Sequence, residues 1–183
     1  NKVTNRFEIF PIEGERQGFF SMALWEDEAQ NLWIGTWENG IWKLDPNTRQ
    51  VEKFLDSDDK AISHIHSILE YTPEILLIGS DDGLTIFNRI TAESRSYTSY
   101  GEEDTSLSDK FIYPMLKDRE GGIWIGTYYN GVNYLPPYSG QFKGYSASED
   151  YPFFHSKIIS RFCEDREGYI WIASDDGGLS RYN

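Results

Sequence analysis

The stretch Asn31-Leu32-Trp33-Ile34-Gly35-Thr36 decides the fold, because the chain repeats it three more times. Residues 122–127 (GIWIGT) are a close copy, and residues 75–80 (ILLIGS) and 169–174 (YIWIAS) are weaker ones. The aligned positions, 33, 77, 124 and 171, are 44, 47 and 47 residues apart. A glycine turn and then an apolar residue follow each copy, as in Asn39-Gly40-Ile41. A period of this size predicts a repeat architecture.

Each unit is predicted to be a four-stranded antiparallel sheet. An alternating run such as residues 21–26 comes first, then a tight turn, then the repeated stretch. Asn-Gly and Asp-Gly turns, which tolerate positive φ, connect it to a third strand. Four strands in roughly 40–50 residues is the period of a β-propeller blade. A helical solenoid is excluded because no segment has 3.6-residue apolar spacing. We therefore expect an all-β chain of about four blades, with inner strands at residues 21–26, 64–70, 112–117 and 158–164.

We expect the whole chain, residues 1–183, to be one propeller segment that forms part of a larger propeller. Residues 1–16 are expected to be the last strand of a preceding blade plus a loop. Blades follow at residues 17–56, 57–100 and 101–145, and residues 146–183 form an incomplete blade. The lone strand at 7–10 could complete that last blade or belong to a blade outside the chain. We expect stability only with neighbouring blades, with a second copy, or with this N-to-C closure.

Composition excludes several classes of protein. The net charge of −13 disfavours nucleic acid and anionic lipid as partners, because both need the opposite sign. No stretch approaches the roughly 18 apolar residues of a membrane-spanning helix, so no membrane insertion is expected. Cys163 is the single cysteine, which rules out an internal disulfide. Its apolar surroundings predict a thiol packed in the core.

The ligand site is expected where the turns between second and third strands meet the connections between blades. These turns (36–40, 80–83, 127–131 and 174–178) and connections (56–63, 101–110 and 146–157) hold fourteen carboxylates and three lysines, or −11 of the net −13. Aromatic rings beside carboxylates suit a sugar, whose C–H faces stack and whose hydroxyls form hydrogen bonds. Solvated acidic loops, with rings packed on the next blade, are the other interpretation. The residues that we expect to contact a ligand are Trp37, Glu38, Asn39, Asp81, Asp82, Tyr128, Tyr129, Asn130, Asp175 and Asp176.

Catalytic and metal sites are not expected. His64 and His66 would share one face of a strand, but neither a cysteine nor a third histidine is near them in sequence. The Asp81-Asp82-Gly83 turn lacks the oxygen spacing of a calcium loop. No phosphate-binding glycine loop or nucleophile motif is present. No cofactor is predicted.

At residues 31–36 and their copies, with the preceding Glu-Asp-x-x-Gly turns, the chain resembles the two-component regulator propeller repeat. Residues 164–172 (EDREGYIWI) are the best copy, whereas the second blade departs from the pattern at Leu77 and at residues 71–73 (YTP). The resemblance implies the periplasmic region of a hybrid two-component sensor, which is part of an inner-membrane protein with a histidine kinase beyond the membrane. It also implies that the protein detects products of polysaccharide breakdown.

Two classes of function therefore compete with the sensor hypothesis, in which the segment binds an oligosaccharide or another small ligand. One is a propeller enzyme that acts on carbohydrate, which needs paired carboxylates, or a histidine with a carboxylate, near the ring centre. The other is a scaffold propeller that binds another protein through the same face. No charged residue recurs at a fixed position on the inner strands, so the sensor is preferred.

Overall fold

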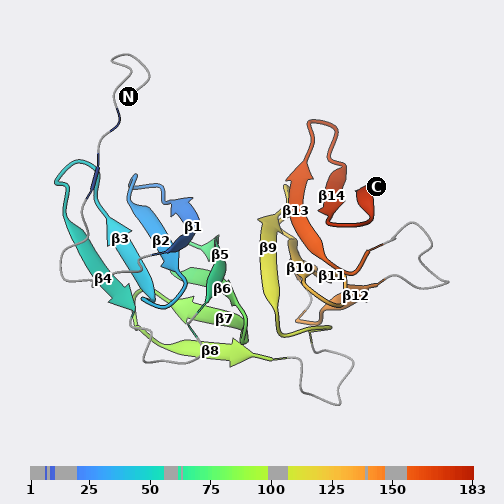
Figure 1. Cartoon of the computed structure of the whole chain (residues 1–183), viewed down its shortest axis with the longest axis horizontal. Coiled ribbons are helices and arrows are strands. Elements are labelled where there is room, and N and C mark those ends of the chain that lie inside the picture. Colours follow the sequence, from blue (N-terminus) through green and yellow to red (C-terminus); the bar gives the residue numbers. More distant parts are fainter. Residues whose placement is uncertain are drawn as a thin grey trace.

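The computed structural model describes residues 7, 9–10, 20–55, 62, 64–98, 107–138, 140–146 and 156–183. These residues form fifteen strands and no α-helix, with the strands in four antiparallel sheets (Figure 1). Three sheets have four strands and the last has three, and in each the strands follow chain order. The predicted all-β propeller-blade fold is confirmed. Among the described residues, no helix has the length and apolarity needed to span a membrane.

The four sheets are numbered here as blades 1 to 4. Blade 1 comprises β1 (Ser21–Glu26), β2 (Leu32–Thr36), β3 (Ile41–Leu44) and β4 (Val51–Leu55). Blade 2 comprises β5 (Ile65–Thr72), β6 (Ile75–Ser80), β7 (Gly83–Asn88) and β8 (Ser94–Tyr97). Blade 3 comprises β9 (Ile112–Lys117), β10 (Ile123–Thr127), β11 (Val132–Leu135) and β12 (Lys143–Tyr145). Blade 4 comprises β13 (Ile159–Glu164), β14 (Ile170–Ser174) and β15 (Gly178–Tyr182).

The first strand of each blade is the innermost, as predicted. β1 packs on β5, β5 on β9, and β9 on β13, so the inner strands gather at the middle while β4, β8 and β12 lie outside (Figure 1). The blades form an arc, and β13 does not pack on β1 as neighbouring inner strands do. Observed and expected inner strands agree within one residue at each end, except that β5 continues to Thr72.

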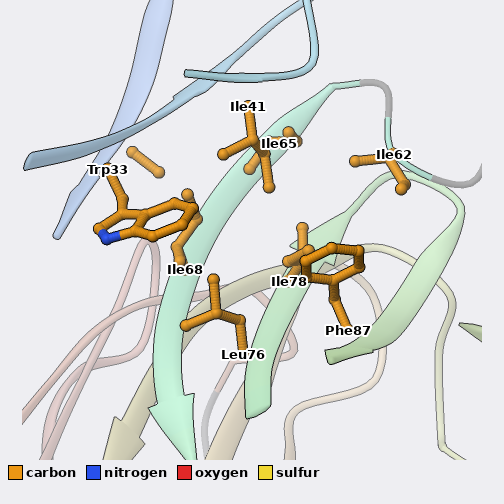
Figure 2. Close-up of a cluster of buried hydrophobic side chains, with 9 residues drawn as sticks. Trp33, Ile41, Ile62, Ile65, Ile68, Leu76, Ile78 and Phe87 are labelled. Atoms are coloured by element: carbon orange, nitrogen blue, oxygen red, sulfur yellow. The ribbon is translucent and has the colours of Figure 1, made fainter. Parts of the chain in front are cut away.

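The core lies between blades rather than inside one sheet. We call the face of a blade that contacts the preceding blade its leading face, and the opposite one its trailing face. Between blades 1 and 2, the trailing-face residues Trp33 and Ile41 meet the leading-face residues Ile68 and Ile78 (Figure 2). Equivalent clusters join blades 2 and 3, and blades 3 and 4. Successive side chains of the repeated stretch therefore point alternately to the interface with the preceding blade and to the interface with the following blade.

The glycine of the repeated stretch exists because the next blade comes very close. A Cβ added to Gly35 would lie 2.5 Å from Cγ2 of Ile65, the first residue of the next inner strand. The same contact would be 2.7 Å between Gly79 and Ile112, and 2.7 Å between Gly126 and Ile159. At each of the three interfaces, a glycine therefore faces an isoleucine of the next blade, and no larger residue would fit at the glycine position without a shift of its neighbours.

An aspartate in the turn between first and second strands fixes the tryptophan of the repeat. The Trp33 indole N–H donates to Asp27 over 2.9 Å, as do Trp124 to Asp118 (2.9 Å) and Trp171 to Asp165 (2.7 Å). The other carboxylate oxygen accepts a backbone N–H four residues later, from Asn31, Gly122 and Tyr169, respectively. One side chain therefore closes the turn and orients the ring.

These hydrogen bonds lower the pKa of two of the turn aspartates, Asp165 and Asp27. Hydrogen bonds, first that from Trp171 and then those from the Tyr169 and Glu167 amides, hold the pKa of Asp165 below its usual value despite some desolvation. At Asp27, burial raises the pKa, but the hydrogen bonds from Trp33 and Asn31 outweigh it and leave the pKa lowered. The charged carboxylate is the form that the turns of Asp27 and Asp165 stabilise.

Blade 2 breaks the pattern, as the sequence indicated. Its aligned residue is Leu77, and no aspartate stands in its turn. Arg89 occupies this end of the blade instead: its guanidinium pairs with Glu70 (3.1 Å) and reaches Asp27 of blade 1 (3.7 Å). It also lies over the Trp33 ring, 5.6 Å from the centroid. An ion pair that crosses the interface replaces the local aspartate–tryptophan bond.

The interpretation of Cys163 as a core thiol is wrong, because the side chain is exposed. Its equivalents Trp25, Leu69 and Leu116 all pack against the next blade. Cys163 has the same position on the trailing face of blade 4, which no described residue of the chain covers in this way. Of the strand tryptophans, Trp33, Trp42 and Trp124 are buried, whereas Trp25 and Trp171 are half-buried.

The lone strand expected at residues 7–10 is not seen in the described part of that segment. Residues 7, 9 and 10 are not in a strand, and β15 has β14 as its partner. Phe7 and Ile9 are exposed. Within the described residues, therefore, the last blade has three strands.

Candidate functional site

The turns between second and third strands share one geometry. The Thr36 hydroxyl donates to the Gly40 carbonyl (2.7 Å) and accepts the Asn39 N–H (2.9 Å). Thr127, Gly131 and Asn130 repeat both bonds, at 2.9 and 3.1 Å. Gly40 and Gly131 have φ values of 68° and 76°, which only glycine adopts without cost. The Asn-Gly pairs are explained by the turn itself.

The residue that follows the turn threonine or serine is anchored beside the inner strand. Its backbone N–H donates to the carbonyl just before that strand: Trp37 to Phe20 (3.0 Å), Tyr128 to Phe111 (3.2 Å) and Asp175 to Ile158 (3.2 Å). The side chain at this position therefore stands at one mouth of the arc of inner strands. In blades 1 to 4 it is Trp37, Asp81, Tyr128 and Asp175.

Aromatic rings from three blades form a continuous row at this mouth. Trp37 lies 4.5 Å from the His64 ring and 5.8 Å from His66, between ring centroids. His66 stacks on Tyr113 of β9 at 4.0 Å with planes 17° apart. Tyr113 contacts Tyr128 at 5.2 Å, and Tyr128 contacts Tyr129 at 4.8 Å. We call these six residues, Trp37, His64, His66, Tyr113, Tyr128 and Tyr129, the aromatic row.

Asp81 supplies the carboxylate that contacts the two histidines of the row. Its two oxygens lie 2.7 Å from His66 Nε2 and 3.6 Å from His64 Nδ1. The His66 side chain is almost wholly buried, while those of His64 and Asp81 are partly exposed. His64 has a φ of 52°, a left-handed conformation that is costly for a residue with a side chain. Asp81 thus places a carboxylate beside two rings of the row.

The electrostatics of the row are set by burial and by Asp81. Burial raises the pKa of Tyr113, and the Asp81 carboxylate raises it further, followed by the neighbouring Tyr128 and Tyr129. The phenol therefore stays protonated and can donate a hydrogen bond at neutral pH. Half-buried rings, a phenol donor and a carboxylate acceptor suit a ligand with apolar faces and hydroxyl groups.

Four of the ten expected site residues lie together in this region: Trp37, Asp81, Tyr128 and Tyr129. Asn39 and Asn130 are used by their turns, and the Asn130 side-chain amide also donates to the Ser108 carbonyl over 2.8 Å. Glu38 and Asp82 are exposed turn residues, as are Asp175 and Asp176 of blade 4. No ring contact or ion pair connects these four to the row among the described residues.

Sequence reasoning missed His64, His66 and Tyr113. The signal was available, because Met22, His66, Tyr113 and Ser160 are the same position of the four inner strands when the strand pairings are aligned. That alignment would have placed two rings side by side. Most of the connecting segments 56–63, 101–110 and 146–157 lie outside the described residues, so the acidic face stays a prediction. Among the described residues, no three histidine, cysteine or carboxylate side chains are grouped as metal ligands.

Comparison with known proteins finds a family model that matches two parts of the chain. The model of the two-component regulator propeller matches residues 106–129 and 153–176, in blades 3 and 4. No curated protein matches the chain. Many solved structures do.

Two of these structures come from Bacteroides thetaiotaomicron. An extracellular domain described as that of a hybrid two-component system is 22% identical, with a TM-score of 0.73 over 92% of this chain and 25% of its own. One described as that of a one-component system is 20% identical, with a TM-score of 0.72 over 93% and 24%. The chain thus spans about a quarter of their length.

A third structure is a computationally designed protein, Ika4, which is 14% identical with a TM-score of 0.64. Here the match covers 97% of this chain and 98% of the designed one. At these identities the likenesses concern the fold. Residues 106–129 and 153–176 therefore match the two-component regulator propeller repeat, and the chain as a whole has the fold of β-propeller blades.

Proposed function

We propose that the chain is a ligand-sensing segment in the extracytoplasmic, periplasmic part of a hybrid two-component signalling protein, responding to sugars from polysaccharides. The observation that carries this proposal is the aromatic row with Asp81 at one mouth of the inner strands. Sugars bind by stacking their C–H faces on such rings and by hydrogen bonds to carboxylates and phenols. The repeat family and the likeness to extracellular domains support the location and the signalling role.

A binding experiment tests the proposal. The chain is titrated with neutral oligosaccharides from starch, xylan, mannan and pectin side chains, with tryptophan fluorescence and calorimetry as readouts. Trp37→Ala and Tyr128→Ala should each weaken binding by about fivefold, since an aromatic contact is worth about 1 kcal/mol. Tyr138→Ala is the matched control, because this ring is 99% exposed and outside the row. Binding that all three variants retain in full would remove the site, and no binding by any probe would remove the ligand class.

One observation favours a second candidate, an enzyme that acts on carbohydrate. His66 and Asp81, in contact at 2.7 Å near the inner strands, form the histidine–carboxylate pair that such an enzyme needs. Against it, His66 is buried beneath Tyr113, which stacks on its ring. The same oligosaccharides, incubated with the chain and separated by chromatography, distinguish the two. Cleavage that His66→Gln abolishes would establish the enzyme, whereas binding without cleavage supports the sensor.

A further inference from the structure

A cavity of about 230 Å³ lies between blades 2 and 3, at an interface inside the arc. Both blades are complete four-stranded sheets, so the cavity does not depend on where the chain begins or ends. Among the described residues, no charged side chain lines it, and no residue of the aromatic row does. The apolar and aromatic side chains that line it come from both blades: Tyr71, Leu77, Ile86 and Tyr97 of blade 2, and Leu135 and Phe142 of blade 3.

The cavity lies where the aspartate–tryptophan pair of the repeat is missing. Leu77 stands at the tryptophan position of blade 2. Glu70 and Glu26 are equivalent in the strand pairings, so Tyr71 stands at the position of the turn aspartate Asp27. Both replacements line the cavity. Lys117 of blade 3 donates to the Tyr71 carbonyl over 2.7 Å, which ties this wall across the interface without the aspartate.

The walls of the cavity are the equivalents of residues that enclose an indole in blade 3. Three rings contact the Trp124 ring, at centroid distances of 4.5, 6.4 and 4.9 Å: Tyr134, Tyr145 and Tyr182. By the strand pairings, the residues at the same three positions around Leu77 all line the cavity: Ile86, Tyr97 and Leu135. Leucine is smaller than tryptophan, so the enclosure is kept while its occupant is reduced. The cavity is therefore the space of a missing indole.

The lining defines the chemistry of a suitable ligand. Tyr71, Tyr97 and Phe142 offer ring faces and edges, against which a flat ring packs favourably. Without a charged side chain in the lining, a buried charge on the ligand would have no compensation. An apolar cavity of about 150 Å³ is enough to hold benzene in another protein, so the larger volume here suits a bicyclic ring.

We propose that the cavity between blades 2 and 3 binds a small, uncharged, planar aromatic molecule of about the size of indole. The ligand lies against Leu77, in the place that the tryptophan ring has in blades 1 and 3. This inference goes beyond the proposed function, because the cavity shares no residue with the aromatic row and takes a different class of ligand.

Indole itself is the probe, since it is the group that the repeat lacks in blade 2. Calorimetry should detect one indole per chain with a Kd of about 1 mM or lower. Leu77→Trp fills the cavity from within and should weaken indole binding by about tenfold or more. Leu24→Trp is the matched control, because this leucine of blade 1 is exposed and outside the cavity, and it should leave binding unchanged. Circular dichroism checks the fold of each variant.

A second variant tests the wall from blade 3 without adding bulk to the core. Phe142→Ala removes a half-buried ring that precedes β12 and should weaken indole binding by about fivefold, the value of one aromatic contact. This variant decides the question if Leu77→Trp does not fold. Trp37→Ala, in the aromatic row, should leave indole binding unchanged, and Leu77→Trp should leave oligosaccharide binding unchanged. The two proposed sites therefore succeed or fail separately.

Three outcomes would overturn the inference. Absence of indole binding up to its solubility limit would remove the site. Unchanged indole binding by Phe142→Ala, or by a folded Leu77→Trp, would place the bound molecule elsewhere on the chain. Binding of 1-hexanol, a flexible aliphatic probe, as tightly as indole would show that the cavity does not select planar aromatic rings.

Discussion

Blades 2 and 3 pack against each other, yet they are built by different means. Blade 3 follows the repeat: Asp118 holds the Trp124 indole, and a threonine–glycine turn ends β10. Blade 2 replaces the tryptophan with Leu77 and the aspartate turn with Arg89 and its partners Glu70 and Asp27. The family model matches segments in blades 3 and 4 and none in blade 2.

The difference shows that the fold needs a buried apolar side chain at the tryptophan position more than it needs the hydrogen bond between tryptophan and aspartate. Leu77 is buried as deeply as Trp124, so an apolar side chain suffices at this position when something else orders the turn. Blade 2 is also where His64, His66 and Asp81 stand, and no other blade has a histidine at the positions equivalent to His64 and His66. The blade that departs from the repeat thus supplies the polar centre of the candidate site.

The largest effect should come from removing the tryptophan of blade 3. Trp124→Ala deletes a buried ring from the core between blades 3 and 4 and leaves Asp118 without its indole donor, so the free energy of unfolding should fall by about 3–5 kcal/mol. Urea denaturation followed by circular dichroism measures it. Trp124→Leu, which installs the residue of blade 2, should cost less. If Trp124→Leu costs as much as alanine, the comparison between the two blades fails.

A smaller loss of stability is expected when a methyl group is added at the glycine that faces the next blade. Gly126→Ala would place a methyl group 2.7 Å from Ile159 and Pro114, and such overpacking costs about 1–3 kcal/mol. Urea denaturation is again the measurement. Gly140→Ala is the matched control, since no atom lies within 4 Å of a Cβ there. Gly79→Ala, in blade 2, should cost a similar amount, because both blades obey the same steric rule. Equal stability of Gly126→Ala and the control would contradict that rule.

The smallest effect concerns pH. The pKa of Asp165 is lowered by its hydrogen bonds, so its contribution to stability is present above the unfolded-state pKa of about 4 and is lost as pH falls through the folded-state value. Asp165→Asn should therefore reduce the stability loss between neutral pH and pH of about 3, seen as a shallower fall of the urea midpoint. Asp176→Asn, an exposed aspartate of the same blade without such bonds, should change this slope little.

The fold could be predicted because similar local sequence signals recur in all four blades. Apolar alternation, the Gly turn and the tryptophan are local signals, and they located the inner strands almost to the residue. The site was harder, because its contacts join residues of different repeats. Trp37 and Tyr128 were found from their turns, but the stacking of His66 on Tyr113 depends on how β5 and β9 align. Cys163 was misread because its apolar neighbours in sequence belong to the other face of its strand.

The aromatic row has a consequence for how the blades hold together. Its rings come from blades 1, 2 and 3, so it exists only while two separate interfaces are closed. Opening either interface dismantles it. By thermodynamic linkage, any molecule that prefers the assembled row opposes the opening of those interfaces, with a strength that grows with its concentration relative to its Kd. A molecule bound at one mouth would thereby hold the first three blades together.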